Sequence, residues 1–223
     1  MTTATTALCT RRGFLLALAS AALAGCARGR PLAGTAGAVA GGGTTRYPFS
    51  RADIEALRVP CIGVTVGETL PGVMFLTRYE ADHALRWESS NRISLVTRRG
   101  RIVATHGLRR DLAATRFATE DPLLESAPPA RAGLTRQVDL VPGDHRDVVY
   151  RSTLEAVGEE FVTVLERTHR TVRITEVLTV RRWQWRALNT YWLEPDSGTV
   201  IRSIQHLAPD SPPIVIDHFG VPA

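Results

Sequence analysis

The sequence predicts a mainly β protein: an antiparallel folded meander, as a curved sheet or an incomplete β-barrel, with one or two short helices. From residue 61 onward, short runs rich in β-branched, aromatic and alternating apolar residues recur, which is typical of strands. Several of these runs are separated by short turns that contain glycine, such as Arg98-Arg99-Gly100 and Pro195-Asp196-Ser197-Gly198. Short turns of this kind join antiparallel strands.

The first 25 residues are predicted to be an export signal. Arg11 and Arg12 precede the apolar run Phe14–Ala24, which is shorter than the roughly 20 residues that a membrane-spanning helix needs. An arginine pair followed by Gly-Phe-Leu is typical of a twin-arginine signal. A general secretory signal with two incidental arginines is the alternative.

The signal ends in Leu-Ala-Gly-Cys, with Cys26 last, which resembles a bacterial lipobox. Cleavage would fall before Cys26, whose thiol would carry a diacylglycerol and whose new amine would be acylated, for example with palmitate. Each buried CH₂ contributes about 0.8 kcal/mol, so several acyl chains together hold a protein on a membrane. Because Ala27 and not aspartate follows, we expect transfer to the outer membrane, facing the periplasm, with inner-membrane retention as the alternative. Residues 26–45, rich in Ala, Gly and Thr, predict a flexible tether.

Residues 46–223 are predicted to form one β-rich domain. Ser50 as a capping residue and Asp53 at the third helical position predict a short helix that ends before Pro60. Leu108–Thr115 predicts a second short helix, and Glu120–Gly133, with three prolines, predicts a loop crossing between two groups of strands. The predicted strands are residues 62–66, 73–78, 84–89, 93–97, 101–105, 134–141, 147–157, 161–167, 171–180, 183–193, 200–207 and 214–218.

Charge and cysteine content exclude several classes of function. All 27 basic residues are arginine, and a chain without lysine has no Walker A lysine, Schiff-base lysine or lysine general base. The net charge of +5 falls to +1 for residues 46–223, with 23 arginines against 22 acids, so no nucleic-acid partner is expected. Cys9 leaves with the signal and Cys26 is lipidated. Cys61, in an apolar run, is therefore predicted to be a buried, unpaired thiol.

No motif in the chain carries recognisable chemistry. No histidine pair has metal-ligand spacing, and neither a Gly-x-Ser-x-Gly elbow nor a dinucleotide fingerprint is present. We therefore predict no catalytic residue, no metal site and no cofactor.

The most unusual segment is residues 183–193, which holds three of the four tryptophans. Alternate residues of a strand share a face, so these rings could stack on sugars or pack in the core. The arginines of this region could line a groove for an anionic polymer or decorate solvent-exposed faces; they are Arg173, Arg181, Arg182, Arg186 and Arg202.

Residues 189–209, with an Asn-x-Tyr-Trp strand, an acidic turn to glycine, and Arg-Ser-x-Gln followed by proline, resemble the YjbF/GfcB family of bacterial lipoproteins. A second similar stretch begins at Trp87, continues through residues 93–112 and ends in Asp121-Pro122-Leu123. Glu194 stands where the family pattern has aspartate, and the twin-arginine signal is not a general feature of the family. With the lipobox, the resemblance covers nearly all of the mature chain.

The resemblance implies a β-rich, membrane-anchored accessory of group 4 capsule or related exopolysaccharide secretion. Its partners would be the membrane, through the lipid anchor, and a polysaccharide or a porin-like outer-membrane secretion protein. A glycan-acting enzyme and a lipid or lipoprotein carrier of half-barrel type are the alternatives. The candidate binding residues are Trp87, Arg101, Arg186, Asn189, Trp192, Arg202 and Gln205.

Overall fold

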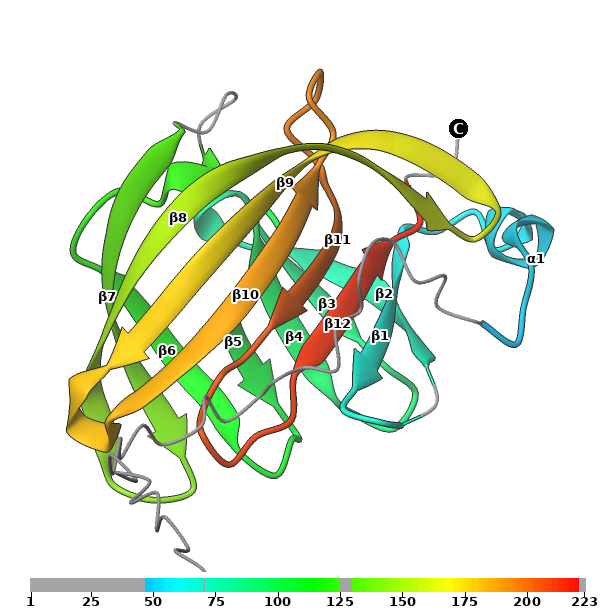
Figure 1. The fold of residues 1–223 in the computed structure, drawn as a ribbon. Helices are drawn as coiled ribbons and strands as arrows, with labels where there is room; N and C mark the ends of the chain where they lie inside the picture. The colour runs from blue at the N-terminus through cyan, green and yellow to red at the C-terminus, as the bar shows by residue number, and fades with distance from the viewer. Residues whose placement is uncertain (1–46, 70, 125–129, 221–223) are drawn as a thin grey trace, which may run out of the picture. The chain divides into compact units, whose positions relative to one another are not determined.

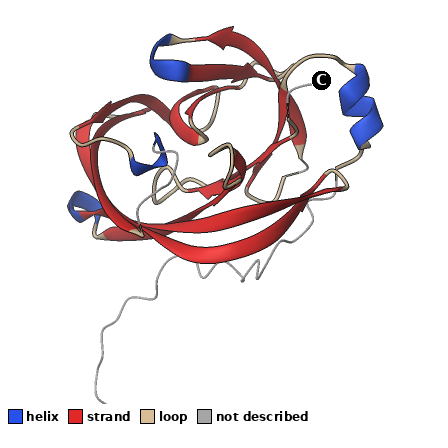
Figure 2. Ribbon diagram, turned by 90° about the horizontal axis from the view of Figure 1, so that it is seen from above, coloured by secondary structure: helices blue, strands red, loops and turns tan. Residues whose placement is uncertain are grey.

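The computed structural model describes residues 47–69, 71–124 and 130–220, in which a single antiparallel sheet of 12 strands curves into a nearly closed barrel (Figures 1 and 2). The predicted mainly β meander is confirmed. The predicted export signal (1–25), Cys26 and the tether to residue 45 lie outside the described residues, so those assignments stay predictions. In the described part of the chain, no helix is long and apolar enough to cross a bilayer.

Strand order follows chain order almost throughout. The strands are β1 (Cys61–Val66), β2 (Gly72–Tyr79), β3 (Ala84–Glu88), β4 (Ser94–Arg98), β5 (Arg101–His106), β6 (Asp111–Phe117), β7 (Arg131–Val141), β8 (His145–Val164), β9 (Arg167–Val180), β10 (Trp185–Leu193), β11 (Val200–Gln205) and β12 (Ile214–His218). Consecutive strands pair with each other except β5 and β6, and β1 also pairs with β12, so β5 and β6 are the two edges of the sheet.

Side chains connect the two edge strands. The Thr115 hydroxyl of β6 donates to the Val103 carbonyl of β5 at 2.8 Å. In the other direction, the Leu112 amide of β6 donates to the Thr105 hydroxyl of β5 at 2.9 Å. These side-chain bonds bring the two edges of the curved sheet together, although β5 and β6 share no strand pairing.

The first predicted helix is confirmed and the second is wrong. Helix α1 (Arg51–Ala56) has Ser50 as its N-cap, with reciprocal bonds between Ser50 and Asp53 that form a capping box. Residues 108–115 instead form a turn and the start of β6. The Asp111 carboxylate accepts the amides of Gly107 and Leu108, each at 3.0 Å, which closes the turn and directs the chain into the pairing of β6 with β7. Three short 3₁₀ turns complete the described helices: η1 (Ala81–His83), η2 (Pro122–Leu124) and η3 (Arg181–Trp183).

Two further predictions on the strands need correction. The predicted strands 147–157 and 161–167 belong largely to one long strand, β8, because a bulge between Ala156 and Gly158 absorbs the glycine without ending the pairing. The hairpin turns later, at Leu165 and Glu166, both at positive φ. Segment 120–133 does not cross between two groups of strands, because it connects β6 and β7, which are neighbours in the sheet.

The buried apolar residues of the described chain form three clusters. The largest lies inside the barrel and includes Trp87, Leu178 and Trp185, and the smallest lies on the inward faces of β7–β10. The second, which we call the outer cluster, consists of Ile54, Cys61, Val162, Val164, Leu165, Trp192, Ile201 and Phe219. The far end of the β8–β9 hairpin extends toward α1 (Figure 1) and supplies three of these residues. Cys61 is unpaired and buried, as predicted, and burial raises the pKa of its thiol.

Candidate functional site

Two arginines and two carboxylates are buried together inside the barrel. The Arg101 side chain of β5 donates from Nε and Nη2 to the two oxygens of Asp121, at 2.6 and 3.1 Å. Its Nη1 donates to Glu176 of β9 at 2.8 Å. Arg136 of β7 donates to the other Glu176 oxygen at 3.0 Å. All four residues are 7% exposed or less, and their charges balance.

Neutral groups complete this network. Ser152, Asn189 and Tyr191 each donate to the Glu176 carboxylate, at 2.6, 3.0 and 2.9 Å. The Asn189 carbonyl oxygen accepts the backbone amide of His206 at 2.8 Å. Gln205 accepts the Ile102 amide at 2.9 Å and donates to the Gly100 carbonyl at 2.8 Å. The buried amides that sequence reasoning offered to a ligand are therefore bonded to the protein.

The network holds Glu176 as an anion. Burial acts to raise the pKa of Glu176, but Arg101 and Arg136, with the hydrogen bonds from Ser152 and Asn189, bring it far below its ordinary value. Burial also raises the pKa of the Tyr191 hydroxyl well above its usual range, so that group stays neutral. The ion pairs connect β5, β7 and β9 with Asp121, which precedes η2. Each of the two arginines has a carboxylate partner, and each of the two carboxylates has an arginine partner.

A small cavity of about 160 Å³ lies within the barrel wall, near the β4–β5 and β10–β11 turns. Trp87, Thr97, Ser203 and His218 are among its lining residues, and the Trp87 indole N–H donates to the Thr97 hydroxyl at 2.8 Å. The His218 ring lies edge-on to Trp87, with ring centroids 5.8 Å apart. Burial lowers the pKa of His218, so its ring is neutral. Its Nδ1 accepts the Gly220 amide, which places the ring proton on Nε2.

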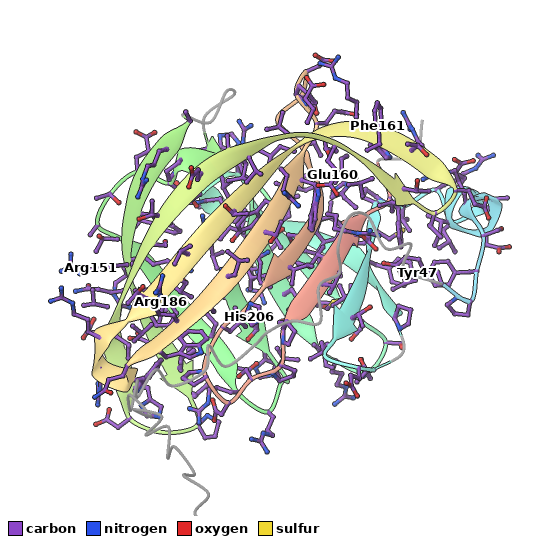
Figure 3. All side chains as sticks on the ribbon, in the orientation of Figure 1. Tyr47, Arg151, Glu160, Phe161, Arg186 and His206 are labelled. Atoms are coloured by element: carbon purple, nitrogen blue, oxygen red, sulfur yellow. The ribbon has the colours of Figure 1, made fainter. Side chains whose placement is uncertain are left out.

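A separate buried ion pair lies beside the outer cluster. Arg202 of β11 forms a two-point ion pair with Asp217 of β12, with Nη2 and Oδ2 2.9 Å apart. The Tyr47 hydroxyl donates to the same Asp217 oxygen, and Gly63 beside them carries no side chain that would displace Tyr47 or Phe219. The Trp192 indole N–H donates to Glu160 at 3.2 Å. Figure 3 shows Tyr47 and Glu160 on this side of the barrel.

The seven candidate binding residues are thus divided among four places. Arg101, Asn189 and Gln205 belong to the interior network, Trp87 lines the small cavity, and Trp192 and Arg202 lie in and beside the outer cluster. Six of the seven are 4% exposed or less; Arg186 alone is exposed, on the outer face of β10. The structure does not bring them together on one surface, and their role in binding stays a prediction.

Sequence reasoning missed several residues of these sites. Glu176 occupies an inward position between Ile174 and Leu178 on β9, and an acid in an otherwise apolar alternating run was a usable signal of a buried ion pair. Asp121 and Arg136 have no comparable signal, because their meeting with Arg101 depends on how the barrel closes. Arg151, which lies near Arg186, was also missed. The described residues contain no group of three side chains suited to hold a metal ion.

The fold and these sites define an antiparallel β-barrel domain whose buried charges tie its strands together. Comparison with protein families then places the chain. It belongs to the family of the group 4 capsule polysaccharide lipoprotein gfcB, YjbF, whose family model matches residues 19–219. The protein is therefore a membrane-anchored lipoprotein of the cell envelope, in a family associated with capsule polysaccharide.

A solved structure has the same fold. The crystal structure of the hypothetical lipoprotein YmcC from Escherichia coli (K12) is similar with a TM-score of 0.71 and 24% sequence identity, covering 77% of this chain and 88% of that one. At this identity the likeness bears on the fold. No curated protein sequence matches the chain.

Proposed function

We propose that this lipoprotein is a non-enzymatic accessory in the secretion or assembly of capsule or a related exopolysaccharide. It binds the glycan, or a porin-like outer-membrane partner, at the surface of its barrel. The observation that carries the proposal is the extent of the family match, residues 19–219, which includes both the lipobox cysteine Cys26 and the entire described barrel.

The buried acids favour this role over that of a glycan-acting enzyme. A glycoside hydrolase needs one carboxylic acid whose pKa is raised so that it can protonate the leaving group. Glu176 has the opposite property, because Arg101 and Arg136 lower its pKa against the effect of burial. Asp121 is held by two bonds from the same Arg101. Neither carboxylate is free to meet a sugar.

The interior is also poorly suited to a lipid carrier. Small-molecule sites in proteins usually measure about 300–1,000 Å³. The cavity beside Trp87 and His218 is about 160 Å³. A second hollow, of about 300 Å³, is lined in part by the ion pair of Arg110 with Asp210, which suits an acyl chain poorly. These features favour a surface that binds a large partner over a chamber that encloses an acyl chain.

We further propose that the chain is exported through the twin-arginine route using Arg11 and Arg12, and is lipidated at Cys26. It then resides in the outer membrane facing the periplasm, where a polysaccharide must cross. Ala27 after the lipidated cysteine supports outer-membrane transfer.

Replacing Cys26 by serine tests anchoring and function together. We expect Cys26→Ser to abolish incorporation of labelled palmitate, to remove the protein from the outer-membrane fraction, and to reduce surface polysaccharide severalfold. A serine cannot form the thioether, so the roughly 0.8 kcal/mol per buried CH₂ of the lipid chains is lost. Cys9→Ser, within the signal and outside the lipobox, is the matched control and should leave all three readouts unchanged. Normal surface polysaccharide in the Cys26→Ser strain would contradict the proposed role.

A further inference from the structure

The outer face of β8–β10 carries a groove lined with arginine. It measures about 260 Å³, and its lining includes Arg151, Arg181 and Arg182 with Val149 and Thr179 between them. All three arginines are exposed to solvent. We call this feature the arginine groove.

The strand register extends the groove to a fourth arginine. Arg151 of β8 pairs with Thr179 of β9, and Thr179 pairs with Arg186 of β10. All three point outward, since the alternate residues Ser152, Leu178 and Trp185 are buried inside the barrel. Two strand spacings separate Arg151 from Arg186, or about 10 Å. Figure 3 shows both on the same flank of the barrel.

These four arginines have no protein partner among the described residues, in contrast to the buried arginines, which are all paired. The one carboxylate that lines the groove, Asp147, is bonded to Arg116 at 2.7 Å. The next acid on the outer face of β8 is Glu155, four residues beyond Arg151, or about 13 Å along the strand. The groove therefore presents several guanidinium groups whose charge the protein itself does not balance.

Apolar side chains lie beside these charges. Val149, two residues before Arg151 on β8, is 39% exposed, and Leu188, two residues after Arg186 on β10, is 51% exposed. A strand of sugars presents both kinds of surface, with apolar C–H faces on its rings and charge on its acidic substituents. A guanidinium group binds a carboxylate or a phosphate with two parallel hydrogen bonds.

We propose that the arginine groove binds the acidic groups, carboxylate or phosphate, of an anionic polysaccharide. The inference rests on the proposed function and specifies its ligand as a charged polymer rather than a neutral one. The recessed geometry favours a chain of sugars over the surface of an anionic membrane, because a flat bilayer contacts protruding side chains, whereas Thr179 and Val149 form part of a hollow.

Binding of polygalacturonate to the full lipoprotein in neutral detergent tests this proposal, with fully methyl-esterified polygalacturonate as the uncharged probe. We expect the acidic polymer to bind and the ester to bind at least about tenfold more weakly. Arg151→Ala with Arg186→Ala should weaken polygalacturonate binding by about tenfold or more, or about 1.4 kcal/mol, because each variant removes a guanidinium that can form two charge-assisted hydrogen bonds. The control pair, Arg78→Ala with Arg167→Ala, removes the same charge from exposed positions on β2 and β9 and should change the affinity less than twofold.

Three results would overturn the proposal. Equal weakening by both pairs would mean that net charge alone is responsible. Equal binding of the ester would exclude recognition of acidic groups. Tighter binding of phosphatidylglycerol in mixed micelles than of polygalacturonate, weakened by the Arg151→Ala, Arg186→Ala pair, would assign the groove to a membrane headgroup. A different result would contradict the proposed function itself. In that case the Cys26→Ser strain would have normal surface polysaccharide, whatever the arginine groove binds in vitro.

Discussion

Glu176→Gln should lower the free energy of unfolding by about 3–5 kcal/mol, the usual cost of removing one partner from a buried ion pair. Glutamine keeps the shape of the side chain but removes the negative charge that faces Arg101 and Arg136, at 2.8 and 3.0 Å. Two buried guanidinium groups then remain in the network with Asp121 as its one carboxylate, which is bonded to Arg101. Urea unfolding at neutral pH measures the loss.

The pH dependence of the same variant gives an independent readout. The pKa of Glu176 is lowered in the folded state, so its contribution to stability is complete above its ordinary value of 4.5 and is lost as the pH falls from there toward the lowered value. The wild-type protein should therefore lose stability more steeply than Glu176→Gln below about pH 4.5. Glu155 lies on the same hairpin, is exposed, and its carboxylate has no partner among the described residues, so Glu155→Gln should change stability by no more than about 0.5 kcal/mol. Equal free energies of unfolding for Glu176→Gln and Glu155→Gln would contradict the claim that the Glu176 carboxylate balances the charges of Arg101 and Arg136.

Trp192→Ala should destabilise the protein by about 3–5 kcal/mol, as large-to-small changes of buried aromatic residues do. The ring is 3% exposed, packs in the outer cluster and donates its N–H to Glu160. Trp192→Phe should recover most of the loss, because it keeps the ring and gives up only part of its area and one hydrogen bond. Thermal unfolding of the three proteins measures the series.

The same variant separates packing from binding. At a temperature where Trp192→Ala is still folded, it should bind polygalacturonate as the wild type does, since the residue lies under the β8–β9 hairpin and away from the arginine groove. Weakened binding with unchanged stability would instead make Trp192 a glycan contact, as the aromatic pattern of residues 183–193 allowed.

Local patterns predicted most of the fold. Alternation along residues 185–193 separated the side chains of β10 into two faces without showing which one faces inward, and the Ser50–Asp53 pair identified α1. The predicted helix at 108–115 and the predicted strand break near Gly158 were wrong for the same reason. The conformational preference of a short segment is weak, and pairing with the neighbouring strands of the sheet outweighs it. Segment 108–115 looks helical alone, but it forms an edge strand next to β7. Gly158 looks like a turn, but pairing on both sides of it continues through a bulge.

The sites were less predictable than the fold, because they join residues that are distant in sequence. Arg101 and Glu176 are 75 residues apart, and only barrel closure brings them within 2.8 Å. The arginine groove depends on strand register: a shift of one residue in β8 against β9 would turn Arg151 inward. Composition showed an excess of arginine but could not separate Arg202, which is buried and paired, from Arg186, which is exposed and has no partner in the described part of the chain.

Amide hydrogen exchange with and without polygalacturonate tests most directly whether the polysaccharide binds the outer face of the barrel. The arginine groove predicts new protection in residues 147–151 and 179–188 of the full lipoprotein, and its loss in the Arg151→Ala, Arg186→Ala pair. Protection confined to the cavity beside Trp87 and the turn at 197–200 would place the ligand within the barrel wall and contradict the assignment.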